Sequence, residues 1–465
     1  MSESFRRFIR SAAQGSTGLL LSITTLLGCS QSEAATAACP SGNAGLTLPT
    51  GFCATIFADS VGHARHIVVA RNGTVYVNTW SGRYYQTPPH TGGFLVALRD
   101  TNSDGRADVI VRFGKTYSAA TTAPATAARS VAPASEKRGA GGTGIAIYKN
   151  YLYAEEGSTV VRYALNPASP SPTSRAEVVV TGLPLTGDHP MHSIAIDSNG
   201  NLFMDSGSET NSCQLKNRAR QSPGHKPCTE LVTRGGIWRF DANKLNQPFS
   251  AANRYATGIR NAVGISVGPD GSLYSTQHGR DQLAENWPTL YSAEQGQNLP
   301  AEELLRIRRS ADYGWPMCYF DNSQRKLVLA PEYGGDGGKT VGDCASKLEP
   351  IAFFPAHWAP DGLVFYTGNT FPARYRGGAF IAFHGSWNRA PGPQGGYQVV
   401  FVPFSGGKPA SPSGFEKFAD GFAEGKMQPD KAVHRPTGLA VGPDGALYIA
   451  DDQGGRVWRV TFGGK

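Results

Sequence analysis

Four short segments of the sequence carry charged or imidazole side chains between stretches of apolar residues. They are Asp188-His189-Pro-Met-His192, Gly258-Ile-Arg260-Asn261, Gln277-His278-Gly279-Arg280-Asp281, and His434-Arg435-Pro436 followed by Asp451-Asp452. Arginine suits bidentate binding of carboxylates, and a positioned histidine can act as a general base. The four segments therefore favour a site that binds an anionic ligand and moves a proton.

The two histidines of the first segment differ in their expected roles. His192 directly precedes the alternating strand Ser193-Ile-Ala-Ile-Asp197, so we expect it to pack as a structural histidine at the start of that strand. His189 stands on the connection before the strand and is free to face a site. His189 is therefore the histidine of this segment that can face the mouth of a channel.

A separate segment, Asp100-Thr-Asn102-Ser-Asp104-Gly105-Arg106-Ala107-Asp108, follows the pattern of a calcium loop, with oxygen-bearing side chains alternating before a glycine. The glutamate that usually closes such a loop is missing, because Val111 stands there. We predict a structural calcium ion held by Asp100, Asn102, Asp104 and Asp108. The alternative is an Asp/Asn-rich turn without a metal.

The elements that would position these segments come from a sequence repeat. In each copy, two stretches of alternating apolar and polar residues flank a tight turn. Copies cover residues 66–80, 143–157, 192–207, 262–279 and 437–452, and a degenerate copy covers 362–384. Each copy predicts a β-hairpin. Six copies predict an all-β, six-bladed β-propeller with loop and short-helix insertions, for example a helix over 301–311. The alternative, a β-sandwich with extra domains, leaves the recurrence unexplained.

The composition agrees with a turn-rich β fold. The 465 residues include Gly 57 and Pro 31, whereas charged residues make up only 17%. Helical bundles and disordered chains are disfavoured by these values. The net charge of +8 is not gathered into a Lys/Arg-rich block, so we expect no nucleic-acid partner.

The first 28 residues have the pattern of a secretory signal, with Arg6, Arg7 and Arg10 before an apolar stretch. The sequence Leu26-Leu27-Gly28-Cys29 resembles a bacterial lipobox. It predicts an exported, periplasmic or cell-surface protein whose only membrane attachment is a lipid on Cys29. The alternative is cleavage after Ala35 or Ala38 without a lipid. Residues 29–53 would form a tether and 54–465 the propeller.

Six cysteines remain when Cys29 is set aside. An even number in an exported chain indicates disulfides, and we predict that sequence neighbours pair. The expected bonds are Cys39–Cys53, Cys213–Cys228 and Cys318–Cys344.

The order of five motifs resembles the soluble PQQ-dependent glucose/sorbosone dehydrogenase family, and in particular its sorbosone branch. The motifs are Asp188-His189 before LFMDSG, Gly258-x-Arg260-Asn261 before PDGSLY, Tyr313-Gly-Trp-Pro316, His384-Gly-Ser-Trp-Asn-Arg389, and Arg435-Pro-x-Gly before PDGALYIADD. The resemblance implies a six-bladed propeller with pyrroloquinoline quinone (PQQ) over the channel mouth and calcium on its quinone edge.

The resemblance also implies roles for individual residues. His189 would be the general base and Asp188 would orient it. Arg260, Asn261, Arg435 and Asp452 would contact PQQ, and the backbone carbonyls of Gly279 and Arg280 would bind calcium. The chain departs from the glucose-dehydrogenase branch at Gly139, where that branch has a glutamine, and at residues 384–389, where it has a lysine. Arg389 could supply the missing charge, and these departures argue against glucose as the preferred substrate.

The sequence therefore predicts an exported quinoprotein dehydrogenase that oxidises a sugar or sugar aldehyde and passes electrons to a soluble or membrane acceptor. Two alternatives stay open. One is a calcium-dependent lactonase or related hydrolase on the same scaffold, whose calcium would bind inward carboxylate and asparagine side chains. The other is a non-catalytic propeller that binds a glycan or a protein. The abundance of Arg and His in the motifs favours the dehydrogenase.

Overall fold

The computed structural model describes residues 42–79, 92–115, 142–389 and 391–463. Cys39, Gly139 and the signal and lipobox residues lie outside the described residues. None of the helices within these ranges is long and apolar enough to cross a membrane.

Six antiparallel sheets of four main strands form the blades of a propeller, which confirms the predicted fold. Five blades use consecutive parts of the chain, listed here from the inner to the outer strand. They are β2(Ala64–Val69), β3(Val75–Thr79), β4(Leu95–Arg99), β5(Val109–Phe113); β6(Ile145–Tyr148), β7(Tyr151–Glu156), β8(Thr159–Ala164), β9(Glu177–Thr181); β10(Ile194–Ile196), β11(Asn201–Ser206), β12(Gly236–Asp241), β14(Arg254–Thr257); β15(Ile265–Val267), β16(Leu273–Gln277), β17(Glu302–Ile307), β20(Ala352–Phe354); and β21(Pro360–Phe365), β22(Ala379–Phe383), β23(Gln398–Val402), β26(Glu416–Ala419).

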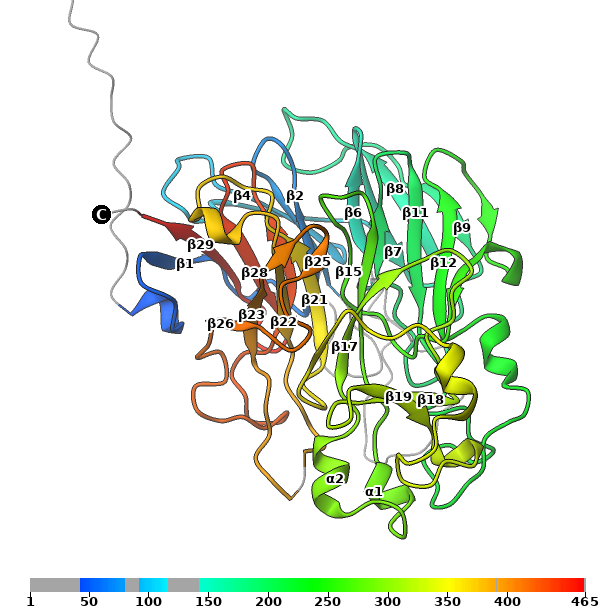
Figure 1. The fold of residues 1–465 in the computed structure, drawn as a ribbon. Helices are drawn as coiled ribbons and strands as arrows, with labels where there is room; N and C mark the ends of the chain where they lie inside the picture. The colour runs from blue at the N-terminus through cyan, green and yellow to red at the C-terminus, as the bar shows by residue number, and fades with distance from the viewer. Residues whose placement is uncertain (1–41, 80–91, 116–141, 390, 464–465) are drawn as a thin grey trace, which may run out of the picture. The chain divides into compact units, whose positions relative to one another are not determined.

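The sixth blade closes the ring by combining the two ends of the described chain. It contains β27(Pro436–Val441), β28(Leu447–Asp451) and β29(Val457–Phe462), and its outer strand is β1(Phe52–Ala58). Figure 1 shows the blue β1 beside the red β29. The six predicted hairpins are the two inner strands of the six blades, and the inner strands contact one another in a ring.

Six hydrophobic clusters lie between adjacent blades, one at each of the six interfaces. Both faces of each sheet are therefore buried, and a strand can carry consecutive apolar residues. This corrects the helix predicted over 301–311, because its core is the strand β17. Leu304 packs toward the fifth blade and Leu305 toward the third, which explains the apolar pair without a helix.

The inner strands approach each other closely where glycines replace larger residues. A Cβ atom on Gly362 would lie 2.0 Å from the carbonyl oxygen of Thr437, and one on Gly438 would lie 2.3 Å from that of Arg65. Only glycine fits such contacts, so these positions fix how tightly the blades meet at the axis.

Insertions between strands carry the remaining elements. They include the helices α1(Leu283–Asn286) and α2(Ala293–Asn298), the strands β13(Gln247–Pro248), β18(Cys318–Asp321), β19(Lys326–Leu329), β24(Phe404–Ser405) and β25(Lys408–Pro409), and the 3-10 helices η1(Asn43–Gly45), η3(Thr229–Val232), η4(Ala251–Asn253), η5(Pro331–Tyr333), η6(Gly342–Ser346) and η7(Ala373–Tyr375). The predicted disulfides Cys213–Cys228 and Cys318–Cys344 are present in two of these insertions. Cys53 is also disulfide-bonded, but its expected partner Cys39 is outside the described residues.

Closure of the ring depends on Phe52 at the start of β1. Its ring centroid lies 4.7 Å from that of Phe371 and 4.9 Å from that of Phe418, in the cluster between the fifth and sixth blades. We expect Phe52→Ala to lower the free energy of unfolding by about 3 to 5 kcal/mol, measured by chemical denaturation, because it leaves a cavity in this cluster. Ile110→Ala, at a side chain that is 51% exposed, is the control. Equal effects of the two substitutions would contradict the closure role.

Candidate functional site

A cavity of about 900 Å³ lies at one mouth of the channel. Its lining includes seven of the predicted site residues, namely Asp188, His189, Arg260, Asn261, Gly279, Arg435 and Asp452. They come from the connections before the inner strands and from the ends of the second strands, which the propeller brings to one face. Arg280 and Arg389 are not among the lining residues.

Polar side chains at the ends of the second strands hold these connections in place. Glu155 Oε1 accepts a hydrogen bond from the backbone N–H of His192, and Gln277 Oε1 accepts one from that of Arg260. Asp451 Oδ1 accepts one from the backbone N–H of Arg435 at 2.6 Å. Gln277 and Asp451 hold the same position in their blades and fix the connection before their own blade, whereas Glu155 stands one residue earlier in its repeat and fixes the connection before the next blade.

Ser208 orients the imidazole of His189. His189 Nδ1 lies 2.9 Å from Ser208 Oγ and 3.1 Å from the Ser208 carbonyl oxygen. Ser208 Oγ donates its own proton to the Thr210 carbonyl, so both Ser208 atoms act as acceptors toward the ring. Nδ1 therefore carries the proton, and Nε2 keeps a lone pair. Burial, together with the positive charge of Arg260, holds the pKa of His189 well below its usual value.

The carboxylate of Asp188 binds other partners. Its Oδ2 accepts hydrogen bonds from Arg218 Nε at 3.0 Å and from Asn217 Nδ2 at 3.2 Å. The orienting role expected of Asp188 is therefore performed by Ser208. Asp188 instead helps to hold Arg218, which also lines the cavity.

His192 is fully buried and lies away from the cavity lining. Its Nδ1 is 2.8 Å from Glu155 Oε1, which also accepts from its backbone N–H. This arrangement is that of a structural histidine at the start of β10. His189 and His192 thus have separate environments, as their sequence positions predict.

A buried ion pair joins Arg260 to Asp281. Arg260 Nη2 is 2.9 Å from Asp281 Oδ2, and Nη1 donates to the Gly279 carbonyl at 2.9 Å. Arg218 Nη2 reaches the same Asp281 oxygen at 3.0 Å. Although burial opposes ionisation, the two guanidinium groups hold the pKa of Asp281 far below its usual value. Arg260 is therefore a paired internal cation with one side toward the cavity.

Asn211 completes this ion pair and was missed by the sequence analysis. Its Oδ1 accepts from Arg260 Nη2 and from the backbone N–H of Asp281, and its Nδ2 donates to the Asp281 carbonyl. Its own carbonyl accepts from Arg260 Nε and Trp315 Nε1. The side-chain Oδ1 and Nδ2 of Asn211 and its backbone carbonyl thus all form hydrogen bonds within the site.

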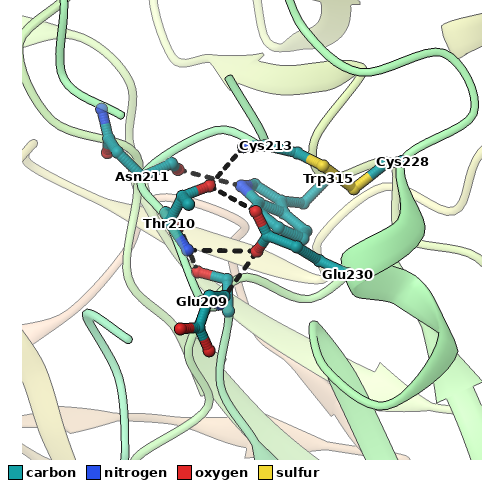
Figure 2. Close-up of a disulfide and its surroundings, with 8 residues drawn as sticks. Glu209, Thr210, Asn211, Cys213, Cys228, Glu230 and Trp315 are labelled. Atoms are coloured by element: carbon teal, nitrogen blue, oxygen red, sulfur yellow. Dashed lines mark hydrogen bonds between the residues drawn. A yellow bond between two sulfur atoms is a disulfide. The ribbon is translucent and has the colours of Figure 1, made fainter. Parts of the chain in front are cut away.

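Figure 2 shows how the insertion closed by Cys213–Cys228 holds Asn211. The carboxylate of Glu230 accepts from the backbone N–H groups of Glu209 and Thr210 and from Thr210 Oγ1. Thr210 Oγ1 in turn accepts from the backbone N–H of Cys213. The disulfide therefore closes the insertion that positions Ser208 beside His189 and Asn211 beside Arg260.

The predicted calcium turn at Gly279 and Arg280 is engaged by protein groups. The Gly279 carbonyl accepts from Arg260, and its N–H donates to Glu302 Oε2. The Arg280 side chain forms an ion pair with Glu332. Calcium at Gly279 would lie beside the Arg260 guanidinium, so the turn does not fit that role in this arrangement. Within the described ranges, no group of three or more His, Cys, Asp or Glu side chains is placed to hold a metal ion.

A second network at the mouth centres on Arg65 and Asp361, which the sequence analysis also missed. Arg65 Nη1 is 2.5 Å from Asp452 Oδ2 and 3.2 Å from Asp361 Oδ2. His278 Nε2 is 3.1 Å from Asp361 Oδ1, and His384 Nε2 is 2.8 Å from Asp452 Oδ1. Burial lowers the pKa of His278, but Asp361 outweighs this effect and raises it overall. Asp452 therefore forms an ion pair with Arg65 and a hydrogen bond with His384.

A sequence signal for this network exists in the repeat. Arg65, His192 and Asp361 each stand two residues before an isoleucine or leucine of an inner strand, namely Ile67, Ile194 and Leu363. A comparison of the six copies at this position would have selected them.

Arg435 is the predicted cation best placed to bind a ligand anion. Its Nε and Nη2 donate to the backbone carbonyls of His384 and Gly385, at 3.0 and 2.7 Å. Among the described residues, no carboxylate forms a salt bridge with this guanidinium. Asn261 offers a second group that could bind a ligand, because its buried Oδ1 has no hydrogen-bond partner among the described residues.

Arg389 does not supply charge to the cavity, contrary to the expectation. Its Nη1 donates to the Ala356 carbonyl and its Nη2 to Asn298 Oδ1. These bonds attach the loop after β22 to α2. Arg389 therefore stabilises the position of this loop.

The loop of Asp100, Asn102, Asp104 and Asp108 lies away from the cavity. Its side-chain oxygens accept hydrogen bonds from the backbone N–H groups of Thr101, Ser103, Gly105, Asp104 and Arg106. These are the bonds of an Asx-rich turn. Calcium binding by this loop stays a prediction.

Comparison with known proteins gives a consistent picture. A family model described as TrAA12-like matches residues 114–462. A pyrroloquinoline quinone-dependent pyranose dehydrogenase from Coprinopsis cinerea is 29% identical over 272 residues, which cover 49% of this chain and 34% of that protein. The chain spans less than half the length of the curated relatives it matches.

Two solved structures share the fold over 90% of this chain. The holo form of the pyranose dehydrogenase PQQ domain from Coprinopsis cinerea is 20% identical, with a TM-score of 0.66 and 97% of that domain covered. The iodide structure of the Trichoderma reesei family AA12 enzyme is 19% identical, with a TM-score of 0.67 and 98% covered. At these identities the likeness concerns the fold.

The hydrogen bonds of Asn211 predict a measurable role for this residue in stability. We expect Asn211→Ala to lower the free energy of unfolding by about 1 to 3 kcal/mol, because the buried backbone N–H of Asp281 loses its acceptor and Arg260 Nη2 loses one of its two. Asn199→Ala, in an exposed hairpin turn, is the matched control. Chemical denaturation measures both. A loss no larger than that of the control would contradict the role of Asn211.

Proposed function

The chain belongs to the TrAA12-like family, and on this basis we propose that it is a dehydrogenase that oxidises a sugar with bound PQQ. The observation that carries the proposal is the imidazole of His189, which is held neutral with Nε2 unprotonated in a cavity lined by arginine and histidine side chains. The named activity of the Coprinopsis relative supports it.

The residues of the cavity fit PQQ. The volume of about 900 Å³ lies within the range of cofactor sites. PQQ carries three carboxylates, and Arg435 has N–H groups that no carboxylate among the described residues engages. The buried Oδ1 of Asn261 has no hydrogen-bond partner in the described ranges and can accept from a ring N–H. Arg435 and Asn261 would therefore hold the cofactor, with Arg260 contributing positive charge from its ion pair.

Calcium has no step in this account. The Gly279 carbonyl that the family resemblance assigns to calcium already binds Arg260. The hydrolase alternative needs several carboxylates converging on calcium, whereas Asp281, Asp361 and Asp452 each bind arginine. The carboxylates of the cavity are thus arranged for ion pairing.

Bound PQQ supplies an ortho-quinone that accepts a hydride. His189 Nε2 accepts the proton of the sugar hydroxyl while the hydride leaves the same carbon, so the sugar loses two electrons and two hydrogens and becomes a lactone. Nδ1–H continues to donate to Ser208, whose carbonyl stabilises the imidazolium that forms. Because the pKa of His189 is low, the ring is unprotonated at neutral pH and passes its proton on readily.

The proposal also includes the substrate, the electron acceptor and the localisation of the protein. The matching family model is TrAA12-like, so oxidation of a sorbosone-like aldehyde stays a prediction from the motifs. Electrons would leave to a soluble or membrane acceptor. Export and lipid attachment at Cys29 are proposed from residues 1–41, which lie outside the described part of the chain.

Reconstitution tests the proposal directly. We expect the apoprotein to bind PQQ, seen as a change in quinone absorbance, and to reduce a dye when aldoses are added. Arg435→Ala should weaken PQQ binding by about tenfold or more, because a carboxylate loses a charged partner. Arg374→Ala, an exposed arginine away from the cavity, is the control. Absence of PQQ binding by the wild type would overturn the proposal.

The two histidines provide a second test. His189→Ala should keep PQQ and lose about 10²-fold or more in turnover, because the positioned base is removed. His192→Ala should keep turnover and lower thermal stability, because Glu155 loses its imidazole partner. Steady-state kinetics and thermal denaturation measure the two effects. A well-folded, inactive His192→Ala together with an active His189→Ala would refute the assignment.

A further inference from the structure

A second hollow of about 610 Å³ lies beside the cavity. Its lining is formed by Trp387, residues 392–394 and residues 425–431, and we call it the Trp387 groove. Trp387 and Pro429 line both the groove and the cavity. The groove is therefore a continuation of the cavity toward solvent.

Two exposed apolar side chains line the Trp387 groove. Trp387 is 53% exposed and Met427, on the other segment, is 43% exposed. Large apolar side chains are exposed at only three other positions in the described residues, namely Ile110, Leu215 and Val232, and none of these lines either hollow. Exposed apolar surface beside a site marks a place where a ligand binds.

The loop that carries Trp387 is held firmly on both sides. Tyr397 Oη donates to the Ser386 carbonyl at 2.8 Å, and Asn388 Nδ2 donates to Asp281 Oδ1 at 2.8 Å. The second bond ties the loop to the ion pair of the cavity. Arg389 attaches it to α2, as described above, and Gln297 Oε1 of the same helix accepts from the Gly392 N–H at 2.7 Å. The indole is therefore presented without a large entropic cost on binding.

The polar groups of the groove suit hydroxyl-bearing ligands. Gln428, Asp430 and the lysines 426 and 431 supply donors and acceptors of both kinds around the indole. A pyranose ring has an apolar C–H face that packs on an aromatic ring and an edge of hydroxyls that hydrogen-bond to such side chains. The groove thus has the chemistry of a saccharide subsite.

We propose that the Trp387 groove binds the second and following pyranose rings of an oligosaccharide whose reducing-end ring occupies the cavity. This inference rests on the proposed function, because the reducing-end ring is the one oxidised. The preferred substrates would then be short oligosaccharides, with Trp387 as a specificity-determining residue.

The test compares chain lengths in the PQQ-loaded full-length protein with a small dye as electron acceptor. The substrates are glucose, cellobiose, cellotriose, maltose and maltotriose. We expect kcat/KM to rise from the monosaccharide to the better of the two oligosaccharide series. Trp387→Ala should lower the ratio of kcat/KM on the trisaccharide to kcat/KM on glucose by about tenfold, and Met427→Ala, at a side chain that lines only the groove, should lower the same ratio while keeping its activity on glucose. Trp387→Phe should retain most of the gain, and Leu215→Ala should match the wild type.

A binding measurement separates this inference from the proposed function. Calorimetric titration with reduced cellotriose and reduced maltotriose, which have no oxidisable reducing end, does not depend on turnover. Binding that Trp387→Ala abolishes would support the groove even if no sugar were oxidised. Oxidation of glucose without any effect of chain length or of Trp387→Ala would overturn the groove and leave the proposed function standing. A Trp387→Ala defect seen only with a protein electron acceptor would also overturn it, because it would indicate an acceptor site.

Discussion

The ion pair between Arg260 and Asp281 is the interaction on which the site depends. Both groups are buried, and a buried charge is stable only when its partner and its hydrogen bonds are all in place. Here the bonds come from the blade 3 insertion through Asn211, from Gly279, from Arg218 and from Asn388 on the loop after β22. Two further segments, the insertion between β11 and β12 and the loop after β22, are thus tied to a pair that itself joins the connection before β15 to the segment after β16. These bonds fix the positions of the segments around the cavity.

The same pairing decides which charges a ligand meets. Arg65 pairs with both Asp361 and Asp452, His278 and His384 lie beside these carboxylates, and Asp281 pairs with two arginines. Arg435 makes hydrogen bonds to backbone carbonyls and no salt bridge within the described residues. The described lining holds four arginines and four aspartates, so an anionic ligand would be met by Arg435 rather than by a net positive cavity, and the buried His189 is kept neutral in the same cavity. An uncharged imidazole suits removal of a proton from the hydroxyl of an uncharged sugar.

The features that could be predicted from the sequence are those encoded by short local patterns. The hairpins were predictable because period-two alternation and tight turns are encoded within some fifteen residues, and the two observed disulfides join sequence neighbours. The helix at 301–311 was wrong because burial of both faces of β17 mimics a helical apolar run. The partners of the site residues were not predictable: Arg65 meets Asp452, and Arg260 meets Asn211, only because the ring closes and the insertion folds back. Arg389 was misjudged for the same reason, since its carbonyl and amide partners lie on other segments.

The central claim is that this cavity moves a hydride from a sugar carbon while His189 takes the hydroxyl proton. Its most direct test is a single-turnover measurement on the PQQ-loaded protein with an aldose carrying deuterium at C1. The account predicts that reduction of the bound quinone is slower with the deuterated sugar than with the ordinary one. Quinone absorbance that does not change when either sugar is added would contradict it.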